Sequence, residues 1–138
     1  MGRVEAVNIS PARGIEKTSI DKVEIIEGWG LEGDAHGGDW DRQVSIFMVE
    51  SLEKVPPEKK EEVLKGGFTE NITISGINPA DLAIGSLVKV GRAVVKILYI
   101  GKESYKEHGR PYIVSREGRF GRVIQGGTVK VGDDVLVF

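Results

Sequence analysis

Short stretches of alternating apolar and polar residues, together with short continuous apolar runs, dominate the hydrophobic pattern of this 138-residue chain. Alternation is typical of a half-buried strand, and an apolar run such as VSIFMV is typical of a strand buried on both faces. The sequence VGRA predicts a tight hairpin turn at residues 90–93. The pattern predicts about seven strands, at residues 3–8, 21–27, 44–49, 70–75, 87–90, 93–100 and 135–138.

Helical patterns are few. Residues 57–65 (PEKKEEVLK) begin with a proline, which suits a first helical position, and a glycine pair follows them. A second, shorter helix is expected after Ser115, because Phe120, Val123 and Ile124 recur at helical spacing. Many short strands with two or three short helices predict a mainly β fold, a closed or partly closed β-barrel, in a single domain over residues 1–138.

Composition sets the broad class of protein. Hydrophobic residues make up 40% of the chain and charged residues 29%, as in globular domains. No apolar run approaches the roughly 20 residues that span a bilayer, so we expect no membrane association. The start of the chain shows no signal-peptide pattern, which favours a cytoplasmic location. The few Asn, Gln and Met residues favour a thermophilic source.

The chain contains no cysteine, and this excludes more chemistry than any other count. Without thiols there is no disulfide, no thiolate metal site, no iron–sulfur cluster and no cysteine nucleophile. The only histidines are His36 and His108, so a three-histidine metal site is also excluded. We predict no metal site formed by the protein's own side chains.

Charge is unevenly distributed along the chain, which carries a net charge of −2. Residues 102–130 hold seven basic and three acidic side chains, whereas residues 1–101 hold 12 basic and 16 acidic ones. The basic segment is either a solvated face or an anion-binding surface.

The segment GLEGDAHGG at residues 30–38 is rich in glycine and carries Asp34 and His36. Glycines let the backbone approach a ligand closely and direct N–H groups at an anion. A strand rather than a helix is expected after it, which distinguishes the segment from a nucleotide-binding glycine motif. The alternative is a long turn in which Asp34 and His36 satisfy local backbone groups. As metal ligands, these two residues alone are too few.

Two further polar stretches merit attention. Adjacent residues of a strand face opposite sides, so Glu70 and Asn71 cannot both face one pocket without a bulge. The alternative is that Asn71 forms a hydrogen bond with a neighbouring loop.

On the expected second helix, Arg119 and Arg122 share a face and Arg116 lies one turn earlier. Such arginines bind phosphate well. We therefore expect an anion site formed by the 30–38 segment with Arg116 and Arg122.

Taken in order, several segments resemble the MOSC domain, which is named for the C-terminal part of molybdenum-cofactor sulfurases. The resemblance covers roughly residues 28–135 and rests on the segments GLEGDAHGG, RQVSIFMVE, FTENITISGI, LAIGSLVKVGRAVVKILYIGKES and SREGRFGRVIQGGTVKVGDDV. It implies a mostly β, barrel-like fold that occurs alone or fused to sulfurase and reductase modules. It also implies an association with the molybdenum cofactor, a pterin that carries a phosphate, and with sulfur transfer.

The resemblance also implies site residues. The family's polar positions correspond to His36, Arg42, Glu70, Asn71, Lys102, Arg116, Glu117 and Arg122. Pyridoxal phosphate belongs to a separate domain of the fused sulfurases and is not expected here. Where relatives often have cysteine, this chain has Ser104 and Tyr112, and their hydroxyls cannot carry sulfur as a persulfide.

The leading hypothesis is a stand-alone MOSC-domain protein that binds a phosphate-bearing pterin of the molybdenum-cofactor type. It would act as a carrier, storage or delivery module for a molybdoenzyme or sulfurase partner. The expected binding residues are Gly33, Asp34, His36, Arg42, Asn71, Lys102, Arg116 and Arg122.

Two alternatives remain open at the level of sequence. One is an enzyme that acts on a small anionic substrate with His36 or Glu70 as the general acid or base. The other is a nucleic-acid-binding barrel that uses residues 102–130, although few aromatic residues lie beside these basic ones for base stacking. The sequence does not decide whether the protein catalyses a reaction, or its oligomeric state.

Overall fold

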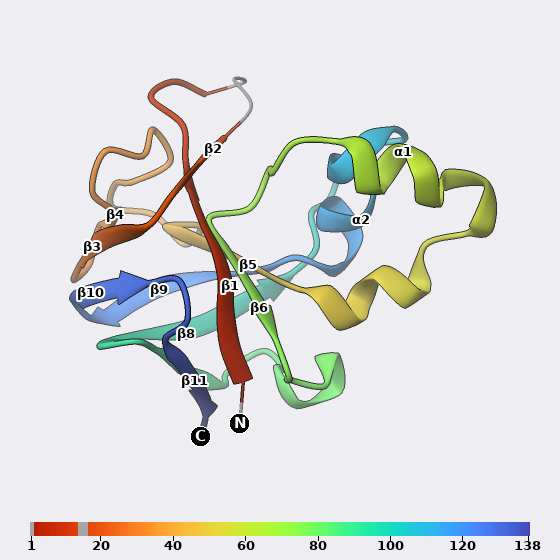
Figure 1. The fold of residues 1–138 in the computed structure, drawn as a ribbon. Coiled ribbons are helices and arrows are strands. Elements are labelled where there is room, and N and C mark those ends of the chain that lie inside the picture. The colour runs from red at the N-terminus through yellow and green to blue at the C-terminus, as the bar shows by residue number, and fades with distance from the viewer. Residues whose placement is uncertain (1, 14–16) are drawn as a thin grey trace.

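In the computed structural model, residues 2–13 and 17–138 are described (Figure 1). Seven strands form a closed barrel, because β1 pairs with β6 on one side and with β11 on the other. Neighbouring strands are antiparallel except for the parallel pair β5–β6. Around the barrel the order is β1 (Gly2–Ile9), β11 (Asp134–Val137), β7 (Leu87–Val90), β8 (Ala93–Ile100), β9 (Arg119–Gln125), β5 (Val44–Met48) and β6 (Ile72–Ser75). The predicted mainly β, closed barrel is confirmed.

Short strands flank the barrel. Strand β2 (Thr18–Ile20) pairs with the C-terminal end of β1, from Val7 to Ile9. A separate three-stranded sheet has the order β10 (Gly127–Lys130), β3 (Lys22–Ile26) and β4 (Gly30–Leu31). No helix of the described residues is long and apolar enough to cross a membrane.

The barrel interior is filled mainly by Val and Ile, whose branched side chains suit a pleated strand surface. Ile46, Ile74 and Val95 are fully buried there. Burying each such side chain contributes about 1.5–3 kcal/mol. This core fixes the barrel and therefore the strand ends from which the loops emerge.

The helices gather on one side of the barrel, to the right in Figure 1. A second apolar cluster joins Phe47 of β5 and Phe120 of β9 to the helices through Val63, Ile113 and Val114. The helical elements here are η1 (Val49–Lys54), η2 (Pro57–Lys59), α1 (Lys60–Lys65) and α2 (Gly109–Glu117). A further short helix, η3 (Pro79–Asp81), follows β6 in the chain. The predicted helix at 57–65 therefore has a 3₁₀ first part and an α-helical second part.

The second predicted helix is misplaced. The structure has α2 before residue 118 and strand β9 from Arg119 to Gln125, where the prediction put a helix. At Gly121 the strand passes so close to β8 that an added Cβ would overlap the carbonyl oxygen of Lys96. Because residues three apart on a strand face opposite sides, Arg119 is buried and Arg122 is at the surface instead of sharing one face.

Candidate functional site

A cavity of about 520 Å³ lies where the glycine-rich segment, the residues before β6 and helix α2 meet. His36, Trp40 and Arg42 reach it from the segment that leads into β5. Thr69 and Asn71 reach it from the segment that leads into β6. Pro111, Val114 and Ser115 of α2, with Phe120 of β9, complete a wall that is partly apolar.

The cavity is lined by an excess of cations. Lys17, Arg42, Lys102, Lys106 and Arg110 line it, with His36 beside them. Lys17 forms an ion pair with Asp34 (2.7 Å), and Arg110 forms one with Glu70 (2.8 Å). Arg42, Lys102 and Lys106 form no ion pair with any carboxylate in residues 2–13 and 17–138. Three uncompensated positive charges therefore face one space.

Arg42 is held by its neighbours in a fixed orientation. Its guanidinium carbon lies 4.6 Å from the centre of the Tyr99 ring and 4.5 Å from that of Phe120. Its Nη1 donates a hydrogen bond to the carbonyl oxygen of Gly101 (3.1 Å). The pairing of β5 with β9 and of β9 with β8 brings these rings together. A guanidinium has five N–H donors, so donors remain for an anion.

Lys102 follows Gly101 after the end of β8; it lines the cavity and is an exposed residue. Its Nζ is 5.4 Å from the centre of the Phe120 ring. Partial burial lowers the pKa of the Lys102 ammonium, and the positive charges of Arg42, Lys106 and Lys17 lower that pKa further. Because like charges converge here without carboxylate partners among the described residues, an anion among them would be stabilised.

The glycine-rich segment is organised by Asp34, whose side chain is fully buried. The carboxylate accepts hydrogen bonds from Lys17 Nζ (2.7 Å), from the Ser10 backbone N–H (2.9 Å) and from the His36 backbone N–H (3.2 Å). Burial raises the pKa of Asp34, but the hydrogen bonds from His36, Lys17 and Ser10 outweigh burial and hold that pKa well below its usual range. Asp34 is therefore an anion that fixes the loop.

His36 connects this loop to the cavity. Its Nδ1 lies 3.2 Å from Lys17 Nζ. The same Nδ1 lies 3.6 Å from Asp34 Oδ2, so it stands between the ammonium and the carboxylate. The side chain retains 35% of its exposure and borders the cavity. Asp34, Lys17 and His36 thus form a chain of polar contacts that ends at the cavity.

Glu70 and Asn71 have different surroundings. The buried Glu70 carboxylate is bound by Arg110 and by the Thr73 hydroxyl (2.7 Å), away from the cavity lining. The Asn71 Oδ1 accepts from the Ser45 backbone N–H (3.0 Å), and its Nδ2 donates to the carbonyl oxygen of Asn8 (3.3 Å). Asn71 therefore both joins neighbouring segments and lines the cavity.

The structure brings together four of the predicted binding residues, namely His36, Arg42, Asn71 and Lys102. Asp34 does not line the cavity itself but accepts a hydrogen bond from Lys17, which does. Gly33 does not line the cavity either.

Arg116 and Arg122 also lie elsewhere. Arg116 lies over the rings of Tyr105 (4.5 Å) and Tyr112 (4.3 Å), outside the lining. Arg122 pairs with Asp39 and Asp41 at the surface. The expected anion site of the 30–38 segment with Arg116 and Arg122 is not formed, because the helix that was to carry Arg122 is a strand.

Sequence reasoning missed Lys17, Lys106 and Arg110 as members of this site. Lys106 and Arg110 belong to the basic 102–130 segment, which was the available signal. Lys17 stands among polar residues and reaches the site only through long-range folding, without a signal in the sequence. Ser104 lies in an exposed loop, and Tyr112 does not line the cavity. The described residues contain no group of three or more His, Cys, Asp or Glu that could hold a metal ion.

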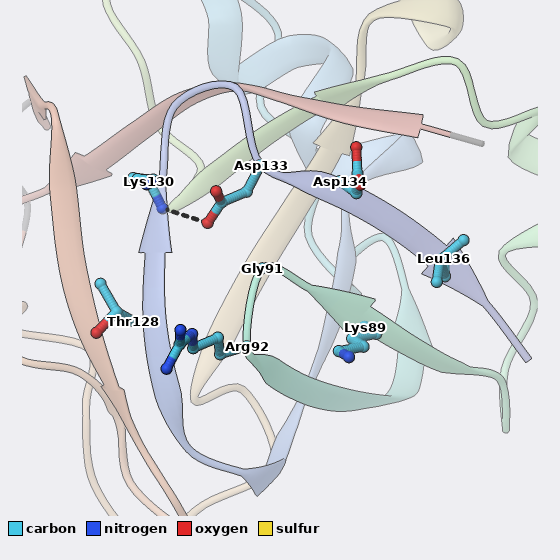
Figure 2. Close-up of a pocket in the computed structure, with 8 residues that line it drawn as sticks. All are labelled: Lys89, Gly91, Arg92, Thr128, Lys130, Asp133, Asp134 and Leu136. Carbon is cyan, nitrogen blue, oxygen red and sulfur yellow. Dashed lines mark hydrogen bonds between the residues drawn. The ribbon is translucent and has the colours of Figure 1, made fainter.

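A second depression of about 570 Å³ lies between the β7–β8 hairpin and the turn from β10 to β11 (Figure 2). Lys89, Arg92 and Lys130 line it together with Asp133 and Asp134, so positive and negative charges are nearly balanced. Figure 2 shows that Asp133 already accepts a hydrogen bond from the Lys130 backbone N–H (2.9 Å). This balance makes the cationic cavity the stronger candidate site.

The fold and the cavity define a closed β-barrel protein with a cationic ligand-sized cavity beside its helices. The sequence profile of the MOSC domain matches residues 32–99, which confirms the resemblance to this family that the sequence motifs indicated. No curated protein matches the chain in sequence.

Solved structures show the same fold. The YuaD protein from Bacillus subtilis has a TM-score of 0.69 and 19% identity, over 99% of this chain and 96% of that one. YiiM from Escherichia coli has a TM-score of 0.67 and 20% identity, over 99% and 69%. YiiM from Geobacillus stearothermophilus has a TM-score of 0.67 and 17% identity, over 100% and 75%.

Proposed function

We propose that the cationic cavity binds a phosphate-bearing ligand of the molybdenum-cofactor type and that the protein carries or delivers it. The observation that supports this most is the convergence of Arg42, Lys102 and Lys106 without carboxylate partners among the described residues. The match of residues 32–99 to the MOSC domain, a family associated with this cofactor, supports the identity of the ligand.

The residues fit the organic part of such a cofactor. The cavity volume lies within the range of roughly 300–1,000 Å³ that is usual for small-molecule sites. Trp40, Val114 and Phe120 offer apolar surface for a flat ring. The Thr69 hydroxyl oxygen is buried and has no hydrogen-bond partner in the described residues, which leaves it available to a ring edge. Arg42, Lys102 and Lys106 would hold the phosphate.

We expect no metal ligation by the protein's own side chains. The chain has no cysteine, and the described residues form no cluster of metal-ligating side chains. A cofactor of this type supplies its own molybdenum when bound. The role of the chain is therefore recognition of the phosphate and the ring.

The first experiment measures thermal unfolding at increasing concentrations of inorganic phosphate and pyrophosphate. Binding to the native state raises Tm with ligand concentration. We expect Arg42→Ala to lose most of this rise, since a charge-assisted hydrogen bond contributes about 1.5–3 kcal/mol. The control is Arg122→Ala, which removes an arginine paired with Asp39 and Asp41. A rise that Arg122→Ala abolishes and Arg42→Ala keeps would overturn the proposed site.

The second experiment tests the ligand. Protein purified from a host that makes the molybdenum cofactor is denatured, and any released pterin is oxidised and measured by fluorescence. We expect pterin with the wild type and less with Arg42→Ala. Absence of pterin with the wild type would overturn the cofactor assignment, while the phosphate response would retain the anion site.

One observation favours a catalytic alternative. The chain from Asp34 through Lys17 to His36 ends at the cavity, where His36 could exchange a proton with a bound anion. Glu70, the other acid–base candidate, is enclosed by Arg110 and Thr73. Hydrolysis of 4-nitrophenyl phosphate that His36→Gln abolishes and Arg122→Ala keeps would support an enzyme. No hydrolysis by the wild type would count against this alternative.

A further inference from the structure

We propose that Lys102 is a carbonyl-reactive lysine, which forms an imine with a phosphate-bearing aldehyde held in the cationic cavity. This inference rests on the proposed function in one respect, because the same cations would hold the phosphate of the aldehyde. It adds a covalent reaction to a site otherwise described as a binding site.

The backbone holds Lys102 in place at the cavity. Its N–H donates to the carbonyl oxygen of Ser115 (2.8 Å), and the N–H of Gly101 donates to that of Gly118 (2.8 Å). Gly101 has a φ of +73°, and a Cβ there would lie 2.8 Å from the carbonyl oxygen of Arg116. The junction of β8 with the end of α2 therefore fixes the residue from which the Lys102 side chain reaches the cavity.

The surroundings of Lys102 favour the neutral amine, which is the nucleophilic form. Arg42, Lys106 and Lys17 place positive charge around it, and no carboxylate of the described residues pairs with it. Lys54 and Lys65 have a different environment, because Lys54 pairs with Glu117 and Lys65 pairs with Glu61. Neighbouring cations and desolvation are the two conditions that activate lysines for imine formation, and the lowered pKa of Lys102 agrees with them.

The step balances without an oxidant or a reductant. The lysine nitrogen uses its lone pair to form a bond to the carbonyl carbon. The nitrogen then gives up both of its protons, the carbon–oxygen bond breaks, and the oxygen leaves with these protons as water. The product is a carbon–nitrogen double bond. The phosphate beside Arg42 and Lys106 would keep the aldehyde next to Lys102 and raise its effective concentration.

The test uses glyceraldehyde 3-phosphate as the probe, with glyceraldehyde as the matched aldehyde that lacks the phosphate. The full chain is exposed briefly to each, the imine is reduced with borohydride, and the adduct is located by peptide mass spectrometry. We expect one dominant adduct, at Lys102, with glyceraldehyde 3-phosphate. We expect about tenfold less with glyceraldehyde, which corresponds to about 1.4 kcal/mol of binding. Inorganic phosphate should compete.

Two variants complete the test. Lys102→Arg should lose the adduct, and Lys65→Arg should keep it; circular dichroism and Tm establish that both variants fold. Adducts spread over many lysines, or equal labelling by the two aldehydes, would overturn the inference. If phosphate raises the Tm of the wild type but Lys102 stays unmodified, only this inference fails. If phosphate has no effect on Tm, the proposed function itself fails.

Discussion

The carboxylate of Glu70 and the guanidinium of Arg110 form a buried ion pair, in which Arg110 Nη2 lies 2.8 Å from Glu70 Oε2. The pair joins the segment before β6 to the first turn of α2. Glu70 also accepts hydrogen bonds from the Thr73 hydroxyl and the Thr69 backbone N–H, and Arg110 lies 4.7 Å from the centre of the Phe47 ring. This contact holds two walls of the cavity together.

The first prediction concerns this pair. Glu70→Gln should lower the free energy of unfolding by about 3–5 kcal/mol, because it leaves the charge of Arg110 buried without its partner. Urea denaturation measures the change. The control is Glu61→Gln, which removes an exposed carboxylate paired with Lys65 and should cost less than about 1 kcal/mol. Equal losses in the two variants would contradict the prediction.

The second prediction is a pH dependence that arises from Asp34. Its pKa is lower in the folded protein than in the unfolded chain, so the stability it contributes is fully present above the unfolded value of about 3.9. That contribution is lost as pH falls through the lower folded value. Asp34→Asn should therefore be less stable than the wild type at pH 7, and the difference should shrink as the pH falls below about 4. Tm measured from pH 7 downward tests this, and a constant difference would refute it.

The third prediction concerns the close approach of β9 to its neighbouring strand β8 at Gly121. Gly121→Ala should destabilise the protein by about 1–3 kcal/mol or more, because its methyl group would overlap the backbone of Lys96. Gly28→Ala is the comparison, since a Cβ there meets nothing within 4 Å and only the φ of +68° is unfavourable. Chemical denaturation should show the larger loss for Gly121→Ala. A larger loss of stability for Gly28→Ala than for Gly121→Ala would contradict the prediction, because it would mean that β8 and β9 can separate to accommodate the methyl group.

The fourth prediction is that the protein does not relay sulfur as a persulfide. The chain has no thiol, and the hydroxyls of Ser104 and Tyr112 form no stable bond to sulfane sulfur. Incubation with a sulfurtransferase and sulfur-labelled cysteine should leave no covalent label that reductant releases. A cysteine-bearing homologue is the positive control. Because Tyr112 does not line the cavity, Tyr112→Cys should also remain unlabelled; labelling of this variant would mean that sulfur donors approach α2 from its outer side.

The barrel could be predicted from the sequence because most of its strands carry clear local signals. The expected bounds 87–90 and 93–100 match β7 and β8, where a tight turn separates two alternating runs. Strand β9 could not be recognised in this way. It is covered on both sides, by the barrel core at Val123 and by the helical cluster at Phe120, so its alternation is lost. Phe120, Val123 and Ile124 then mimic helical spacing.

The site was predictable in part. His36, Arg42, Asn71 and Lys102 stand in segments that resemble the MOSC domain, and the structure places them around one cavity. Lys17 could not be found, since only the long-range contact with Asp34 brings it there. Arg122 was expected in the anion site because a helix was predicted where the structure has strand β9. The side on which an arginine lies depends on the element that carries it.

The pairing of Gly2 with Val135 has a topological consequence. A ring of seven hydrogen-bonded strands has no first or last member, so the order in which the chain visits the strands is not what stabilises the barrel. The start of β1 and the strand β11 therefore lie side by side (Figure 1). A short linker would therefore join these two strands, and new ends could be opened at an exposed turn elsewhere in the chain. Such a circularly permuted chain would present the same cavity while moving its attachment points to another part of the surface.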